Sequence, residues 1–328
     1  FPTDHADYRQ QIIDLADAYC NQDTITVYTS GSTGKPKKID IPKSHIHNST
    51  LVTAHFFGLD FNSSMLLALS PTYIAGKMML FRSLDYDCKL TCIEAQNDPL
   101  DPLSPEEKFD FVALVPKQLE AIYERSPERL HQFKTILIGG APINKEFERK
   151  IAALHDQVYI SFGMTETVSH CATRKLGSPY YKAVENVSFA VNDSQELIVK
   201  APDLSGRTSL RTHDVVKLIS HQDFEWLGRS DFVINSGGHK IHPEKIEAQI
   251  KHLFDGDIIA VGQPDVTLGE KLIVLSESSV NTSIRNEIKD ILHPYEVPKS
   301  YIEVPKIMRN ANNKIDRNAH KAIYLDET

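Results

Sequence analysis

The residues best suited to chemistry lie in a loop near the start of the chain, Thr29-Ser30-Gly31-Ser32-Thr33-Gly34-Lys35. Glycines let backbone N–H groups close on a phosphate, while the hydroxyls and the lysine add further donors and positive charge. A strand-like run, residues 24–28, precedes the loop. The spacing differs from the G-x-x-x-x-G-K-[ST] pattern of a Walker A loop, which disfavours a P-loop kinase or ATPase. Taken alone, such a loop is more often an ordinary surface turn.

Further segments rich in ligand-binding residue types follow along the chain. They are Ile138-Gly139-Gly140-Ala141-Pro142, Ser161-Phe162-Gly163-Met164-Thr165-Glu166-Thr167, Leu210-Arg211-Thr212-His213-Asp214, Gly228-Arg229-Ser230-Asp231, Asn235-Ser236-Gly237-Gly238-His239-Lys240-Ile241 and Arg309-Asn310-Ala311-Asn312-Asn313-Lys314-Ile315-Asp316-Arg317. An isolated Glu166, Asp214 or Lys314 would ordinarily be a solvated charge or a helix cap. The ordered set makes a functional role the better interpretation of each.

In this order the segments resemble the motifs of the AMP-forming adenylate synthetases, the superfamily of the acyl- and aryl-CoA ligases. The resemblance covers residues 24–318. It implies attack of a carboxylic acid on the α-phosphorus of ATP, loss of pyrophosphate, and transfer of the acyl group to coenzyme A. This chemistry depends on charge neutralisation and positioning more than on covalent help.

The resemblance assigns a set of ATP contacts. They are Thr29, Ser30, Gly31, Ser32, Thr33, Gly34 and Lys35 at the phosphates, Gly139, Gly140 and Ala141 along the adenine, Phe162 and Gly163 beside its face, and Asp214 and Arg229 at the ribose. Thr165 is expected to contact the α-phosphate. Glu166 is expected to bind Mg²⁺, a hard cation satisfied by carboxylate and phosphate oxygens.

The resemblance also implies a catalytic lysine and a hinge. Lys314 would stabilise the negative charge between the acid and the α-phosphate. Rotation about Asp231 would then remove the lysine and bring in the loop for coenzyme A. The expected contacts of that loop are Gly237, Gly238, His239 and Lys240. A plain surface loop remains an alternative for the last two side chains.

The acid-binding residues are predicted from residues 70–84, which resemble a segment of the o-succinylbenzoate–CoA ligases of menaquinone biosynthesis. Tyr73 stands where those enzymes have a histidine, and Arg82 is in register with their arginine. An arginine on an otherwise apolar helix needs a counter-anion if it is buried. A dicarboxylic acid supplies one, because one carboxylate reacts while the other pairs with Arg82. The alternative is an Arg82 that pairs with a protein carboxylate or reaches solvent.

The chain departs from the superfamily in several places. His213 replaces the usual glycine, Phe162 a tyrosine, and Asn313 the glycine before the catalytic lysine. Fewer than thirty residues precede the phosphate loop, where relatives have well over a hundred, and the first residue is Phe1. We therefore expect either that an N-terminal subdomain is dispensed with or that another chain replaces its surface; trimming of the sequence is a further explanation.

The elements that must position these residues alternate between strands and helices, which is typical of a mostly parallel sheet with helices on its faces. The predicted strands are residues 24–29, 65–69, 89–94, 109–115, 135–138 and 158–161. The predicted helices are residues 44–57, 76–84, 117–124 and 145–154, with Ser44 and Asn144 as N-caps. The motifs mostly follow strands, where open α/β sheets bind ligands.

Two domains are predicted. Residues 1–230 form an α/β adenylation domain with a small β-rich subdomain at residues 185–227. Residues 231–328 form a compact, mobile α+β domain with helices at 243–253 and 284–292 and strands at 257–261 and 271–275.

Composition narrows the function classes. A net charge of −8 over 328 residues argues against a general nucleic-acid or anionic-membrane binder. No apolar run approaches the ~20 residues that span a bilayer, and four scattered cysteines give no disulfide framework or zinc pattern. We expect a cytoplasmic enzyme, with a homo-oligomer left open. Alternatives are another acyl- or aryl-CoA ligase, a domain that feeds a carrier protein, or a catalytically silent nucleotide-binding regulator.

Overall fold

The computed structural model describes residues 5–28, 38–141, 143–309 and 315–325. Its largest feature is a mixed sheet of eleven strands, in the order β10-β11-β12-β13-β9-β8-β7-β6-β5-β3-β4. Five neighbouring strands are parallel: β3 (Ser64–Leu67), β4 (Lys89–Cys92), β5 (Phe109–Leu114), β6 (Phe133–Ile138) and β7 (Val158–Gly163). These correspond to five of the six predicted strands.

The other six strands extend this sheet in antiparallel fashion. They are β8 (His170–Lys175), β9 (Tyr180–Ala183), β10 (Ser188–Val191), β11 (Glu196–Lys200), β12 (Leu210–Leu218) and β13 (Asp223–Arg229). The segment predicted as a small β-rich subdomain is therefore β-rich, but its strands continue the main sheet. They have a core of their own, centred on Phe189, Leu197, Val199 and Phe224.

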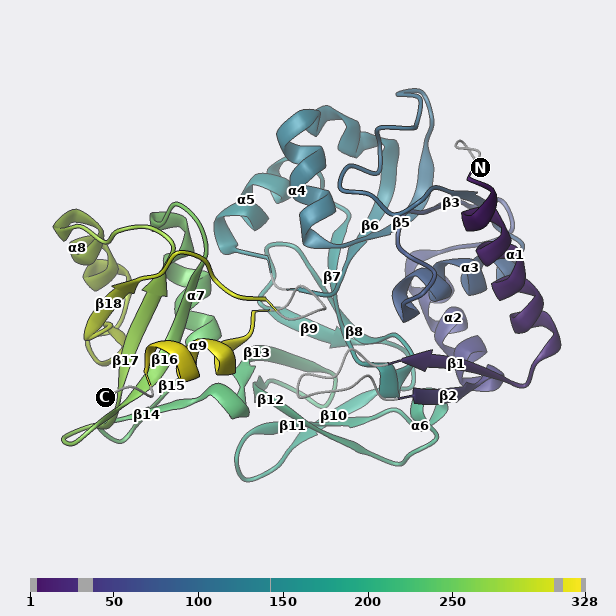
Figure 1. Ribbon diagram of the computed structural model, residues 1–328. Coiled ribbons are helices and arrows are strands. Elements are labelled where there is room, and N and C mark those ends of the chain that lie inside the picture. The colour runs from purple at the N-terminus through teal and green to yellow at the C-terminus, as the bar shows by residue number, and fades with distance from the viewer. Residues whose placement is uncertain (1–4, 29–37, 142, 310–314, 326–328) are drawn as a thin grey trace.

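Helices cover both faces of the parallel strands (Figure 1). On one face lie α4 (Pro116–Arg125) and α5 (Lys145–Leu154); on the other lie α1 (Ala6–Asn21), α2 (Lys43–Phe57) and α3 (Ile74–Tyr86). The sequence of β3 explains the two layers, because Leu66 packs with the first pair of helices while Met65 and Leu67 pack with the other three. A strand that is buried on both faces is apolar throughout and does not alternate between polar and apolar residues.

The N-caps and the first strand test the local predictions. Asn144 accepts a hydrogen bond from the Phe147 N–H at 2.7 Å, so the predicted cap of α5 is confirmed. The cap predicted at Ser44 is wrong, because α2 already begins at Lys43 and follows Pro42. The run at β1 (Thr24–Tyr28) is a strand, but it pairs antiparallel with β2 (Lys38–Pro42) in a separate two-stranded ribbon and not in the parallel sheet.

A second, five-stranded sheet follows the first. Its strands are β14 (Ile234–Ser236), β15 (His239–Ile241), β16 (Ile258–Asp265), β17 (Gly269–Ser276) and β18 (Ser300–Glu303). The helices α7 (Pro243–Ile250), α8 (Thr282–Ile291) and α9 (Arg317–Tyr324) pack on it, and its two faces have separate apolar cores. The short helix η3 (Ser230–Phe232) connects the two sheets.

The predicted fold class is therefore confirmed: an α/β sheet flanked by helices, followed by a smaller α+β unit. Within the described residues, no helix is both long enough and apolar enough to cross a membrane.

Candidate active site

The first part of the predicted nucleotide site lies at the carboxyl ends of adjacent parallel strands. Gly139 directly follows β6, and its N–H donates to the carbonyl of Leu114 at the end of β5 at 3.1 Å. A Cβ on Gly139 would lie 2.7 Å from the Ser161 hydroxyl of β7 and would have to displace it from its hydrogen bond to the Ile138 carbonyl. Gly140 has φ +91°, and both it and Ala141 are exposed. The turn therefore presents bare backbone at the edge where α/β sheets bind ligands.

The threonine–glutamate pair belongs to the short helix η2 (Thr165–Thr167) just after β7. Thr167 secures this helix, because its hydroxyl donates to the carbonyls of Met164 and Ser169 and accepts from the Met164 N–H at 3.1 Å. Glu166 is exposed, and no described residue pairs with its carboxylate. The carboxylate is therefore available to a cation.

Val168 holds a strained conformation directly after this pair. Its φ of 64° and ψ of −57°, together with a 2.7 Å hydrogen bond from the Ser169 N–H to the Thr167 carbonyl, define a γ-turn. Positive φ is rare for a β-branched residue. The Val168 side chain is buried in an apolar cluster that includes Ile46, which fixes the turn. Strain of this kind collects at functional loops.

Phe162 lies in β7 and packs edge-on against Tyr181 and Phe224, with ring centroids 5.8 and 5.2 Å away. The ring is half-buried. It therefore has a packing role in the antiparallel half of the sheet, in addition to the adenine contact predicted for it. Gly163 follows at the exposed end of the strand, where a Cβ would overlap the Ser169 carbonyl.

Asp214 and Arg229 face each other across β12 and β13. The Asp214 carboxylate accepts a hydrogen bond from the indole N–H of Trp226 at 2.9 Å. Arg229 donates instead to Asp231 at 2.5 Å, and His213 lies 3.4 Å from the same carboxylate. The structure thus joins the predicted hinge residue to the predicted ribose-binding strands. Sequence reasoning missed Trp226, although it is the single tryptophan of the chain.

Arg82 is the most unusual charged residue of the described chain. Its side chain is only 2% exposed, it donates to the Ser169 hydroxyl at 3.1 Å, and it lies over the ring of Phe111. Among the described residues, its Nε atom has no hydrogen-bond partner and no carboxylate forms an ion pair with it. Burial lowers the pKa of the guanidinium to about 9, so it is still charged at neutral pH.

His170 adjoins this cation. Burial, and then the charge of Arg82, lower the pKa of its imidazole to about 3, so the ring is neutral. Its Nδ1 lies 3.3 Å from the Ser169 hydroxyl, and its buried Nε2 has no partner among the described residues. Sequence reasoning missed both Ser169 and His170, because a single histidine beside an apolar strand is usually a core residue. Together with Arg82 they form the buried polar cluster, a name used below for these three residues.

Tyr73 does not join the buried polar cluster. It precedes α3, is 57% exposed, and lies nine residues before Arg82. Arg82, by contrast, lies inside the helix and is only 2% exposed, so one side chain faces solvent and the other lies in the core. The structure does not bring the two predicted acid contacts together.

The predicted loop for coenzyme A is a tight hairpin turn between β14 and β15. Gly237 and Gly238 have φ values of 57° and 83°, as a two-residue type I′ turn requires. The hairpin alone therefore explains both glycines. His239 and Lys240 are exposed, and the ring of His239 stacks on Tyr295 at 4.3 Å with an interplanar angle of 7°. His293 contacts the same tyrosine at 4.2 Å.

Other predicted residues lie outside the described part of the chain: the whole phosphate loop from Thr29 to Lys35, and Lys314. Among the residues that are described, no three His, Cys, Asp or Glu side chains gather into a metal site.

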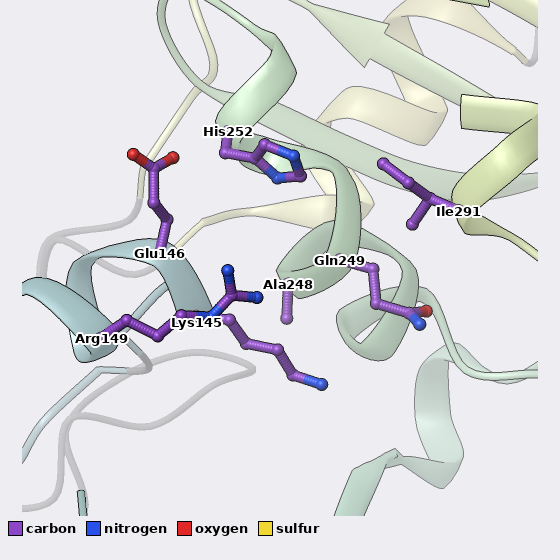
Figure 2. Close-up of a pocket in the computed structure, with 7 residues that line it drawn as sticks. All are labelled: Lys145, Glu146, Arg149, Ala248, Gln249, His252 and Ile291. Atoms are coloured by element: carbon purple, nitrogen blue, oxygen red, sulfur yellow. The ribbon is translucent and has the colours of Figure 1, made fainter. Parts of the chain in front are cut away.

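A groove of about 640 Å³ separates α5 from the helices of the second sheet (Figure 2). Lys145, Glu146 and Arg149 line one side; Ala248, Gln249, His252 and Ile291 line the other. Glu146 pairs with Lys150 at 2.8 Å. None of the predicted site residues lines the groove, so it marks the boundary between the two halves of the molecule and not the nucleotide site.

Glycine and threonine–glutamate turns at the carboxyl ends of parallel strands, followed by a small α+β unit, are the features of an adenylate-forming enzyme. The chain belongs to the AMP-binding enzyme family, which matches residues 16–215. The family and its relatives support the general activity of an AMP-forming acid–CoA ligase.

Particular relatives extend this result. A 2-succinylbenzoate–CoA ligase of Listeria monocytogenes is 27% identical over 90% of this chain and 69% of its own length. An acyl-CoA synthetase (AMP-forming)/AMP-acid ligase II-like protein of Dyadobacter fermentans is 32% identical with a TM-score of 0.66, covering 96% of this chain and 94% of that one. An o-succinylbenzoate–CoA synthetase of Bacillus subtilis, solved with its acyl-adenylate intermediate, has a TM-score of 0.78 at 24% identity, covering 90% and 68%, and shows the shared fold.

Proposed function

We propose that this protein activates a carboxylic acid with ATP and transfers the acyl group to coenzyme A. An oxygen of the acid attacks the α-phosphorus of ATP and pyrophosphate leaves; the thiol of coenzyme A then attacks the acyl carbon and AMP leaves. Family membership and the exposed turns at the sheet edge support this reaction. In this reaction the enzyme acts by positioning the acid and ATP and by neutralising the negative charge of the phosphates.

The nucleotide contacts follow from the geometry of the edge. Gly139, Gly140 and Ala141 are free to lie along an adenine, and Asp214 is held so that an oxygen remains for the ribose hydroxyls. Thr165 and the unpaired carboxylate of Glu166 are suited to the α-phosphate and to Mg²⁺. The cation supplies charge neutralisation when it is bound. The roles of residues 29–35 and of Lys314 rest on sequence alone.

We infer further that the acid is a dicarboxylate, with 2-succinylbenzoate as the specific proposal. The single observation that carries it is the buried Arg82 without a carboxylate partner among the described residues. A lone buried cation is costly, and a substrate carboxylate compensates it with charge-assisted hydrogen bonds. The names of the Listeria and Staphylococcus aureus relatives, at 25–27% identity, agree with this acid. Tyr73 stays a weaker acid-contact prediction because of its exposure.

The proposed domains are residues 1–230 and 231–328, with Asp231 as the hinge. The contacts of Asp231 with Arg229 and His213 lie where the chain leaves the first sheet. The His239–Tyr295 stack offers an aromatic surface beside Lys240, which supports a contact with the nucleotide end of coenzyme A. The cytoplasmic location and a homo-oligomer stay predictions.

The function is tested by pyrophosphate release over a panel of acids, with and without coenzyme A. We expect turnover with 2-succinylbenzoate and a thioester product only when coenzyme A is present. Turnover of a monocarboxylic acid in preference to 2-succinylbenzoate would reject the acid and retain the ligase. Nucleotide binding without pyrophosphate release for any acid would favour the silent regulator.

A further inference from the structure

Trp226 lies against the carboxylate that is proposed to bind the ribose. Its indole N–H donates to Asp214 Oδ1 at 2.9 Å, and both side chains are half-buried. The backbone N–H of Asp214 donates to the Thr212 hydroxyl at 3.0 Å. The indole is therefore the one side-chain donor that the described residues give to this carboxylate.

A β-bulge in β13 creates this contact. Val216 pairs with Trp226, whereas Val215 pairs with Gly228, so Leu227 is an extra residue without a partner in β12. Without the extra residue, Trp226 and Arg229, three positions apart, would point to opposite faces of the sheet. The bulge places both on the face of Asp214, because residues paired across strands share a face.

Helix α7, which packs on the second sheet, lies against the bulge. Gly228 has φ +148°, and a Cβ there would lie 2.7 Å from a carboxylate oxygen of Glu244 in α7. A side chain at this position would have to displace the Glu244 carboxylate and would also hold an unfavourable positive φ. The indole of Trp226 packs against the apolar cluster that contains Val216 and Phe224, so it is not a freely rotating surface side chain.

We propose that Trp226 is a positioning residue for nucleotide recognition: its N–H fixes the Asp214 carboxylate so that the remaining lone pairs point to the two ribose hydroxyls. This inference rests on the proposed nucleotide role of Asp214. One Asp214 oxygen is engaged by the indole, so the carboxylate does not have to lose rotational freedom when a nucleotide binds. Pre-organisation of this kind raises affinity without a new contact to the ligand.

The test compares binding of Mg²⁺–ATP and of Mg²⁺–2′,3′-dideoxy-ATP, measured by titration calorimetry on the full chain. Trp226→Phe keeps an aromatic ring and removes the donor. We expect the Kd for ATP to rise about 5- to 15-fold, the value for the loss of one hydrogen bond. The Kd for the dideoxy nucleotide, which lacks both hydroxyls, should change less than about 2-fold. The ratio of the Kd for the dideoxy nucleotide to the Kd for ATP should therefore be smaller in the variant than in the wild type.

A second replacement guards against misfolding of the phenylalanine variant. Because the chain has one tryptophan, expression with β-(3-benzothienyl)alanine replaces only this indole N–H by sulfur and keeps the ring shape. It should reproduce the selective loss of ATP affinity. Glu225→Gln, the neighbour on the other face of β13, is the matched control and should change neither Kd.

Either of two results for the variants would overturn the inference: an equal loss of affinity for both nucleotides, or a lower thermal midpoint with the ribose preference intact. A wild-type chain that binds both nucleotides equally would overturn it as well. Acid-dependent pyrophosphate release by the wild type tests the ligase separately, so a ligase that fails the nucleotide comparison loses only the role of Trp226. A chain that passes the comparison but releases no pyrophosphate loses only the proposed reaction.

Discussion

Arg82 is the residue on which the proposed choice of a dicarboxylic acid substrate depends. It is fully buried in α3, its guanidinium meets a hydroxyl, a thioether and an aromatic ring, and no described carboxylate compensates it. Arg174, in contrast, is a largely buried arginine that pairs with Glu148 at 3.1 Å. The two arginines have opposite expected behaviour, because one is complete without a ligand and the other is not.

Replacement of Arg82 by methionine should raise the free energy of unfolding of the ligand-free chain, because an uncompensated buried charge is removed at similar volume. The same change should raise the KM for 2-succinylbenzoate by about 10- to 150-fold, the loss of a charge-assisted pair, and leave the KM for ATP nearly unchanged. Arg82→Lys should restore binding only in part, since an ammonium cannot form the bidentate contact. Urea unfolding and steady-state kinetics measure the two effects.

The control is Arg174→Met. It should destabilise the fold, because it breaks an ion pair and leaves Glu148 buried without its partner, and it should leave the KM for the acid unchanged. A purely structural role for Arg82 gives the same pattern as this control. That outcome would leave the acid specificity without its main support.

Lys314 can be tested although it lies outside the described residues. Lys314→Ala should lower adenylate formation by several orders of magnitude and leave ATP binding largely intact, because the lysine acts on charge that develops in the transition state. Thioester formation from pre-formed acyl-adenylate should be spared. Rapid-quench assays of the two half-reactions measure this, and an equal loss in both would argue against exchange of the lysine between steps.

At the scale of elements, the contact between α7 and β13 joins the two sheets through a buried carboxyl group. Burial raises the pKa of Glu244 to about 6 from its ordinary value of 4.5, although Arg317 opposes the change. One of its oxygens has no hydrogen-bond partner among the described residues. Glu247, one turn further along α7, is instead paired with the buried Arg317 at 2.5 Å.

Glu244 should make the fold less stable above pH 6 than below pH 4.5. Between these values the folded state binds the proton and the unfolded state does not, so stability falls as pH rises; above pH 6 the buried charge costs ~2 kcal/mol. Glu244→Gln should remove this dependence and raise the free energy of unfolding at pH 7.5 by up to that amount. Urea unfolding at pH 5 and 7.5 measures it.

The matched control for this change is Glu247→Gln on the same helix. It should lower stability at both pH values, because it weakens the ion pair with Arg317. Parallel pH profiles for the wild type and Glu244→Gln would show that this carboxyl group does not titrate between pH 4.5 and 6.

At the scale of the whole molecule, two units meet along a groove and are joined by a short connection. The groove between α5 and α7 shows that their contact is incomplete (Figure 2). The connection, η3, is a single turn stabilised by side-chain pairs of Asp231 with Arg229 and His213. An incomplete interface and a short link are the properties expected of units that rotate.

Asp231→Pro should slow thioester formation far more than adenylation, because proline fixes φ near −65° and restricts rotation at this residue. The 3₁₀ conformation of η3 is compatible with that angle, so the backbone of this turn should accept the proline. Asp231→Ala removes the side-chain contacts with Arg229 and His213 without restricting the backbone and is the control. The two half-reactions are assayed separately; unchanged turnover of the proline variant would place the hinge elsewhere.

The sequence by itself determined the fold class, the parallel strands β3 to β7, the cap at Asn144 and the family. These follow from local patterns, because hydrophobic period, capping residues and motif order are all read along the chain. It also identified Arg82 as a residue in need of a counter-charge. The mistaken cap at Ser44 and the sheet position of β1 are one-residue and pairing errors, which local patterns do not constrain.

Only the tertiary structure decided how distant residues combine. The main sheet continues through β8 to β13 because of strand pairing, and Trp226 contacts Asp214 because of a bulge. Tyr73 is exposed before α3 while Arg82 is buried within it. The cluster of Arg82 with Ser169 and His170 joins segments 87 residues apart in the sequence. Such contacts depend on the register between elements, and register is fixed by the packing of the whole core rather than by any single segment.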